Sequence, residues 1–289
     1  MKRLFMTMLV GLCLLCGGES VCQAAGRVVT DSVQSKVLGK TIHYNVYLPQ
    51  GFKAGTQKRY PVLYLLHGLY GTHVNWTERG QANVVADLLI SSGEVRPLII
   101  IMPEAGARDL EAFQNGYFNM PEWPYEDFFF QEFMPEVEGK YAVQSDKAHR
   151  AISGLSMGGL GSFGYAQRHP DLFCACYAMS AWMDTPEPQR DRVKGEKAYR
   201  TYRCTYENKP IDYIKKVSDD QKNQWKTVKW FLDCGDDDHL LYCNVELFAA
   251  MRKLHTPIEM RVRNGAHTWE YWHTALYTAL PFVSRNFDK

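Results

Sequence analysis

The chain has 289 residues, of which 46% are hydrophobic, a composition typical of a globular protein that buries a sizeable core. Its formal net charge is only +1, and no long run of charges of one sign occurs. These features give no support to a nucleic-acid partner or to electrostatic anchoring on a membrane.

The N-terminus predicts a secretory signal peptide, residues 1–24. Lys2 and Arg3 form a positive start, residues 4–16 are an uncharged and mostly apolar run, and small residues follow at Ala24 and its neighbour. The apolar run is short for spanning a bilayer, so no stable membrane insertion is expected. We expect cleavage after Ala24 and a mature protein that is secreted or periplasmic.

Eight cysteines are present, three of them within the signal peptide. Those three make a lipoprotein an alternative, but large apolar residues precede each of them where a lipoprotein signal has a small residue. The other five are an odd number, which argues against a full disulfide framework, although one bridge is possible. Cys174 and Cys176 alternate on one side of an apolar stretch and are expected to be buried rather than to bind a metal.

Strand patterns dominate the first part of the mature chain. Residues 28–37 and 41–48 predict an antiparallel pair, and residues 60–66 are a continuous apolar run typical of a strand buried on both faces. Apolar residues recur at helical spacing over 81–91, and residues 97–102 predict another buried strand.

The middle of the chain begins with little periodicity and then becomes regular. Residues 106–124 predict a long loop, and residues 125–141 predict a helix. A buried strand over 148–153, a helix over 157–168 and a strand over 172–180 follow.

Residues 181–227 interrupt this alternation, because they are polar, rich in charge and tyrosine, and poor in apolar runs. An insertion of this kind after a sheet strand is often a lid or a substrate-shaping element. The alternative is a solvated excursion of two short helices.

Alternation returns at the C-terminal end, with a strand over 228–233, a helix over 240–254, a strand over 257–263 and a closing amphipathic helix over 268–287. Strands alternating with helices indicate an α/β fold with a mostly parallel sheet and helices on both faces. No repeat or linker divides residues 25–289, which are expected to form one domain.

A candidate nucleophile lies between the strand over 148–153 and the helix after it. Gly154, Ser156 and Gly158 form the pattern G-x-S-x-G, a sharp turn that presents a serine hydroxyl. A serine needs a base that takes its proton, and the base needs an acid that orients it. In α/β-hydrolases the acid and then the histidine follow the serine in the chain, each after a strand.

The acid is expected after the strand over 228–233. Asp233 is still on that strand, whereas Gly235 provides a turn, and an acid a few residues beyond the turn would lie over the sheet edge. Asp238 is the preferred candidate, with Asp237 as the alternative. At least two of the four carboxylates of this stretch, Asp233, Asp236, Asp237 and Asp238, are expected to belong to a solvated acidic turn.

The base is expected in the turn between the last strand and the final helix, where His267 lies. His255 precedes the strand and His273 lies inside the helix, so both are poorer candidates. Two backbone N–H groups should stabilise the oxyanion, one from Met157 after the serine and one from Leu69 after the first buried strand.

Four motifs together resemble those of one family: YLLHG at 64–68, GLSMGG at 154–159, CGDDD at 234–238 and GAHTW at 265–269. The chain resembles the esterase D-like branch of the α/β-hydrolases, which holds S-formylglutathione hydrolases, bacterial feruloyl and acetyl-xylan esterases, and secreted mycolyltransferases. The resemblance covers most of the mature chain, apart from the insertion over 181–227. It implies an α/β-hydrolase fold, no metal or organic cofactor, a triad of Ser156, Asp238 and His267, and an oxyanion hole formed by Leu69 and Met157.

Export argues against a formylglutathione hydrolase, whose thiol chemistry belongs to the cytosol. It favours a secreted serine carboxylesterase that acts on small-molecule or polysaccharide esters, with feruloyl or acetyl groups on plant polysaccharide as the expected substrates. Trp182 and Trp269 lie beside the expected catalytic loops and are the predicted substrate-binding residues. An acyltransferase using the same triad and a non-catalytic carbohydrate-binding relative are the alternatives.

Overall fold

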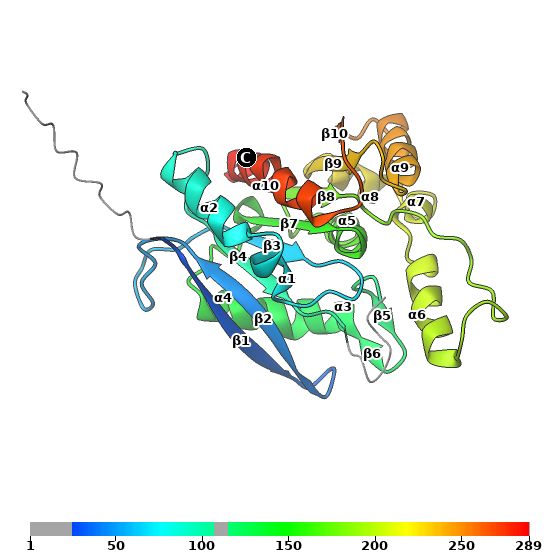
Figure 1. Cartoon of the computed structure of the whole chain (residues 1–289), viewed down its shortest axis with the longest axis horizontal. Coiled ribbons are helices and arrows are strands. Elements are labelled where there is room, and N and C mark those ends of the chain that lie inside the picture. The colour runs from blue at the N-terminus through cyan, green and yellow to red at the C-terminus, as the bar shows by residue number, and fades with distance from the viewer. Residues whose placement is uncertain (1–24, 107–114, 289) are drawn as a thin grey trace, which may run out of the picture.

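The computed structural model describes residues 25–106 and 115–288, and the predicted signal peptide lies outside them. Its centre is an eight-stranded sheet in the order β1-β2-β4-β3-β7-β8-β9-β10 (Figure 1). The strands are β1 (Arg27–Ser35), β2 (Lys40–Leu48), β3 (Val62–Leu66), β4 (Ile99–Pro103), β7 (Arg150–Leu155), β8 (Ala175–Met179), β9 (Lys229–Gly235) and β10 (Ile258–Arg263).

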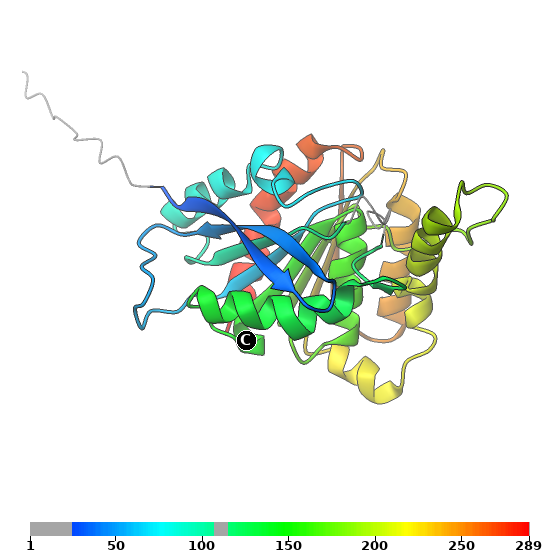
Figure 2. The same cartoon turned by 90° about the horizontal axis from the view of Figure 1, so that it is seen from below.

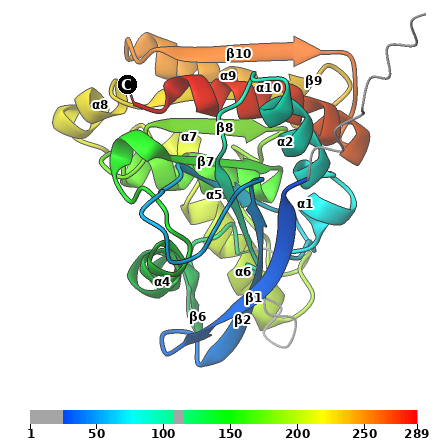
Figure 3. The same cartoon turned by 90° about the vertical axis from the view of Figure 1, so that its left-hand side faces the viewer.

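The sheet is parallel from β4 to β10, and β1 and β2 form an antiparallel pair that joins it through β4. Every residue of β3, β4, β7 and β8 is buried, which explains why these strands read as continuous apolar runs. The β1–β2 hairpin lies at one edge of the sheet and β10 at the other (Figure 3).

Helices cover both faces of the sheet (Figure 2). On one face α2 (Ala82–Ser91) packs against α10 (Trp269–Asn286), together with the short α1 (Asn75–Glu78). On the other face lie α5 (Met157–Arg168) and α9 (Leu241–Lys253), beside a helical segment made of α3 (Tyr125–Phe128), the π-helical turn η3 (Phe129–Phe133) and α4 (Met134–Lys140). A 3-10 turn, η4 (Lys147–His149), leads into β7.

The sequence predicted a long loop over 106–124, and the structure describes only part of this stretch. Residues 107–114 lie outside the described parts, and a small hairpin of β5 (Asn119–Met120) and β6 (Trp123–Pro124) follows them. The sequence missed this hairpin because its two strands are too short to give an alternating pattern.

The segment over 181–227 carries α6 (Glu196–Glu207), α7 (Pro210–Tyr213) and α8 (Asp219–Trp225). It is anchored to the domain rather than free in solvent, because α6 packs beside β5 and α7 contacts α5 and α9. Trp225 is fully buried, and its indole N–H donates to the carbonyl of Gln167 at 2.8 Å. Trp225 thus anchors the end of α8, whereas most other residues of that helix are exposed or partly exposed, as in the solvated alternative considered from the sequence.

The five described cysteines are unpaired, and Cys174 and Cys176 are buried as expected. They lie on opposite faces of the sheet rather than on one, Cys174 near α2 and α10 and Cys176 near α5. None of the described helices combines the length and apolarity needed to cross a membrane.

Candidate active site

Ser156 lies on the turn between β7 and α5, with φ 53° and ψ −116°, a conformation that a non-glycine residue rarely adopts. The turn is so tight that its glycines cannot be replaced freely. A Cβ on Gly154 would lie 2.3 Å from the carbonyl oxygen of Gly158, and one on Gly158 would lie 2.4 Å from that of Leu66. The G-x-S-x-G spacing is therefore a consequence of close backbone approach.

The structure brings Ser156, His267 and Asp238 together from three separate strand ends. His267 Nε2 lies 3.0 Å from Ser156 Oγ, and His267 Nδ1 lies 2.9 Å from Asp238 Oδ2. Both distances are within hydrogen-bond reach for a nucleophile, its base and the group that orients the base. This arrangement can remove the serine proton as the hydroxyl attacks a carbonyl carbon.

Asp238 is the buried member of the acidic stretch, with its side chain fully shielded from solvent. Burial alone would raise the pKa of its carboxyl, but hydrogen bonds from His267 and from the N–H of Leu240 outweigh burial and lower that pKa. The carboxylate therefore stays ionised, and it holds the Nδ1 proton of His267 in place.

The other three carboxylates of this stretch have different surroundings. Asp236 and Asp237 are exposed, and Asp236 accepts the N–H of Gly265 at 2.9 Å. Asp233 is buried on β9, where Tyr271 donates to it at 2.6 Å.

A close contact between two loops aligns Asp238 with His267. A Cβ on Gly235 would lie 2.0 Å from the carbonyl oxygen of Gly265, so only glycine permits the end of β9 to approach the end of β10 this closely. The two alternative histidines have other surroundings. His273 Nδ1 lies 2.9 Å from the carbonyl oxygen of Gly80, and His255 is an exposed residue before β10.

Two backbone N–H groups are available near Ser156. Met157 is the first residue of α5, so its N–H has no acceptor within the helix. Leu69 occupies a corner of the turn over 68–71, which the N–H of Gly71 closes on the carbonyl of Gly68 at 3.0 Å. Leu69 and Ser156 line the same cavity, as the predicted oxyanion hole requires.

His67 fixes the turn that carries Leu69, a role the sequence did not reveal. Its Nε2 accepts the N–H of Ala105 at 3.1 Å, so its Nδ1 carries the proton and donates to the carbonyl of Gly68 at 2.8 Å. Burial lowers the pKa of His67 below 6.5, which keeps the ring neutral in this arrangement.

Ser156 opens into a cavity of about 840 Å³. Trp182 and Trp269, the two predicted substrate-binding residues, both line it. Trp76, by contrast, is fully buried and packs its ring edge-on against Trp269 with the centroids 5.4 Å apart. Sequence reasoning missed other residues that line the cavity, namely Tyr70, Arg79, Tyr202 and His239.

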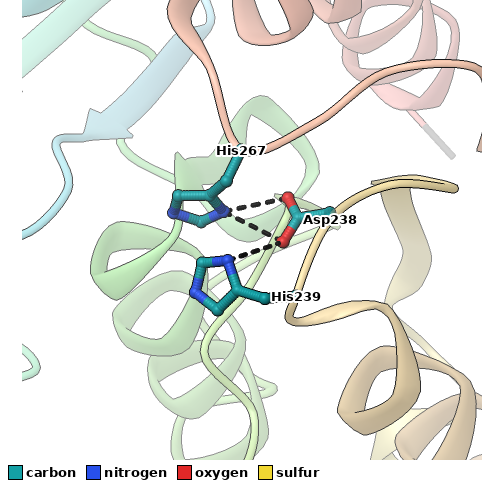
Figure 4. Close-up of side chains that lie close together, drawn as sticks. All are labelled: Asp238, His239 and His267. Atoms are coloured by element: carbon teal, nitrogen blue, oxygen red, sulfur yellow. Dashed lines mark hydrogen bonds and ion pairs between the residues drawn. The ribbon is translucent and has the colours of Figure 1, made fainter.

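His239 also lies beside the acid and the base, as Figure 4 shows. Its Nδ1 is 3.7 Å from Asp238 Oδ1, and its ring meets that of His267 at 4.7 Å. The three side chains are close enough to offer ligand atoms to one metal ion. However, His267 and Leu240 already occupy the Asp238 oxygens with hydrogen bonds, so a metal would have to break the Ser156–His267–Asp238 chain.

A family model described as putative esterase matches residues 35–283. Among solved structures, a ferulic acid esterase is 50% identical, with a TM-score of 0.85 over 91% of this chain and 99% of that one. An S-formylglutathione hydrolase from Agrobacterium tumefaciens has a TM-score of 0.69 at 18% identity over 91% of this chain and 96% of that one, a likeness of fold alone. These neighbours confirm the predicted α/β-hydrolase fold.

The endo-1,4-beta-xylanase/feruloyl esterase of Xylanibacter ruminicola is 32% identical over 169 residues, which make up 57% of this chain and 23% of that protein. The acetyl esterase of Caldicellulosiruptor saccharolyticus is 21% identical over 78% of this chain and 84% of its own length. The chain spans less than a third of the first curated relatives that it matches.

Proposed function

Because the chain belongs to the putative esterase family, we propose that it is a serine carboxylesterase that hydrolyses ester substituents on plant polysaccharide. The observation that supports the proposal most is the pair of hydrogen bonds that link Ser156 to His267 and His267 to buried Asp238, beside a large cavity. The names of its relatives, which include feruloyl and acetyl esterases, support these two acyl groups.

The reaction begins when Ser156 Oγ attacks the ester carbonyl and its proton passes to His267 Nε2. Asp238 holds the imidazolium, and the N–H groups of Leu69 and Met157 bind the oxyanion. His267 then gives its proton to the leaving alcohol, which breaks the ester bond and leaves an acyl-enzyme. Water attacks that intermediate, with His267 first taking the water proton and then returning it to Ser156.

Trp182 and Trp269 are proposed to form apolar walls for the acyl group or for a sugar face. The segment over 181–227 contributes Trp182 and Tyr202 to the cavity, which supports a substrate-shaping role for it. We further propose that residues 25–289 are a single catalytic domain.

We propose that residues 1–24 are a signal peptide and that the enzyme is secreted or periplasmic, where polysaccharide esters occur. Expression of the full chain in a bacterial host followed by N-terminal sequencing of the exported protein tests this. Recovery of protein that starts at Ala25 is the expected result, and retention in the cytoplasm with Met1 intact would contradict it.

The function is tested with Ser156→Ala on p-nitrophenyl acetate, methyl ferulate and acetylated xylan. We expect the wild type to hydrolyse at least one of these esters and kcat to fall by on the order of 10⁶-fold in the variant. A fluorophosphonate should label the wild type and leave the variant unlabelled. Unchanged hydrolysis in Ser156→Ala would overturn the proposal, and transfer of the acyl group to an added sugar in preference to water would indicate an acyltransferase instead.

A further inference from the structure

A second cavity, of about 560 Å³, adjoins the one that contains Ser156. Tyr70 and Tyr202 line both cavities, so the two hollows share these aromatic walls. The rest of the second cavity comes from the start of α6 and the loop before it, and this loop forms an outer edge of the molecule in two views (Figures 1 and 2). A substrate bound at Ser156 can therefore extend past the two tyrosines into the second cavity.

The shared tyrosines suit a saccharide. Tyr70 is 62% exposed and lies in the turn that also holds Leu69, with φ 57°. Tyr202 belongs to α6 and is half-buried. An exposed aromatic ring with a polar hydroxyl gives a sugar both a flat apolar face and a hydrogen-bonding group.

The charged side chains along the two cavities are predominantly basic. Arg79 lines the first cavity, where it stacks over the Trp269 ring at 5.2 Å, and Arg192 and Lys194 line the second. Among the described lining residues Glu187 is the one carboxylate, and Arg203, outside the cavity, pairs with it at 2.7 Å.

No described carboxylate forms an ion pair with Arg79, Arg192 or Lys194. The chain as a whole is nearly neutral, so this is a local excess of positive charge. A groove lined with charges of one sign attracts ligands of the opposite sign.

We propose that the two cavities form one groove for an ester carried by an acidic oligosaccharide, with a uronic acid unit bound in the second cavity by Arg192 and Lys194. The guanidinium of Arg192 can bind the sugar carboxylate through two parallel hydrogen bonds, and Lys194 adds a point charge. Tyr70 and Tyr202 contact the sugar between the carboxylate and the ester. The proposal rests on the esterase function and specifies the alcohol part of its substrate.

The test measures binding without catalysis, so that its failure and the failure of the esterase proposal are distinguishable. Calorimetry on Ser156→Ala compares xylotetraose with a xylotriose that bears one glucuronic acid, neither of which carries an ester. At low salt we expect the acidic saccharide to bind about 10-fold more tightly, because Arg192 and Lys194 are exposed and two exposed ion pairs together contribute about this much at most. The difference should shrink in 0.5 M NaCl because exposed charges are screened.

Adding Arg192→Ala and Lys194→Ala should reduce the difference to about 2-fold or less. The matched control is Arg190→Ala, because Arg190 lies in the same loop but pairs with Glu196 at 2.5 Å and lies outside both cavities. It should keep the preference, and thermal melting checks that all variants are folded. Failure of the acidic saccharide to bind, equal binding of the two saccharides, or a preference that survives in the double variant would each overturn the proposal.

Discussion

Asp237 and Asp238 are adjacent in sequence but differ in burial, so substituting each in turn tests which of them orients His267. Asp238 is buried against His267, whereas Asp237 is exposed. We expect Asp238→Asn to lower kcat on p-nitrophenyl acetate by about 10³- to 10⁴-fold, because the amide no longer holds the Nδ1 proton of His267. Asp237→Asn, the matched control, should stay within about 2-fold of the wild type, since exposed sites tolerate such changes. A large loss in both variants, or in neither, would contradict this role for Asp238.

The lowered pKa of Asp238 also predicts how stability depends on pH. A carboxyl whose pKa is lower in the folded state stabilises the fold above its unfolded value of 3.8, and this contribution is lost as pH falls through the folded value. Wild type should therefore exceed Asp238→Asn in melting temperature at pH 5 to 6, and the gap should narrow as pH falls below about 4. Melting curves across this pH range provide the measurement. A difference in melting temperature that grows as the pH falls would contradict a lowered pKa of Asp238.

His67 acts through the turn that carries Leu69 rather than on the substrate itself. His67→Ala removes the hydrogen bonds to Gly68 and Ala105, so the Leu69 N–H should lose its fixed direction. We expect kcat to fall by about 10- to 100-fold with a smaller change in KM, because a misdirected donor is weakened rather than lost, and full loss of one oxyanion donor costs about 10²- to 10³-fold. His73→Ala is the control, because His73 is close in sequence to this turn but pairs with Glu104 at 2.9 Å instead of bonding to it. An unchanged kcat in His67→Ala, or an equal loss in the control, would exclude the role.

At the scale of elements, two glycines in helices should respond to alanine in opposite directions. Gly158 lies at the start of α5, where a Cβ would meet the carbonyl oxygens of Leu66 and His67 at 2.4 and 2.5 Å. Gly158→Ala should therefore destabilise the protein by about 3 kcal/mol. Gly139 is exposed in α4 with nothing within 4 Å of the Cβ position, so Gly139→Ala should stabilise it by about 0.5 to 1 kcal/mol. Urea unfolding measures both values, and losses of similar size would show that steric contact is not the cause.

The best predictions from the sequence were the helices and strands whose own residues determine their type and their ends. The helix over 157–168 agrees with α5 at both ends, because the serine turn starts it and His169 followed by proline ends it. The inner strands were found from their continuous apolar runs. By contrast, α6 is polar along most of its length and buries only three residues, so the sequence indicated helices over 181–227 only as an alternative.

At the scale of the whole molecule, chain order was enough to propose Ser156, Asp238 and His267, since the fold requires each one after a particular strand. The remainder of the cavity could not be found in this way. Tyr70 and Arg79 are far from Tyr202 in sequence, and only the folded chain brings all three to one cavity. The spacing of residues along the chain does not show which of them will meet in the cavity, because the paths of the loops between the elements decide this.

A buried carboxylate joins the elements that carry two members of the proposed triad. Asp233 on β9 accepts hydrogen bonds from Tyr177 on β8 at 2.5 Å and from Tyr271 on α10 at 2.6 Å, and it pairs with Arg261 on β10. Asp238 follows β9, and His267 lies between β10 and α10. Asp233 thus links the strands and the helix whose ends position the acid and the base.

Removing this carboxylate leaves Arg261 and two buried hydroxyls without their shared partner. We expect Asp233→Ala to lower the free energy of unfolding by about 3 kcal/mol, because the buried Tyr177 and Tyr271 hydroxyls each lose an acceptor and the partly exposed Arg261 loses its ion partner. Glu259→Ala on β10 is the matched control, because Glu259 pairs with Arg285 at 3.4 Å where both side chains are more than half exposed, and its loss should cost at most about 1 kcal/mol. Urea unfolding at pH 7 measures both, with Asp233→Asn as a second variant if the alanine protein does not fold. Equal losses of stability in Asp233→Ala and Glu259→Ala would mean that Asp233 does not hold β8, β9, β10 and α10 together. The alignment of Asp238 with His267 would then depend on the close contact between Gly235 and Gly265 alone.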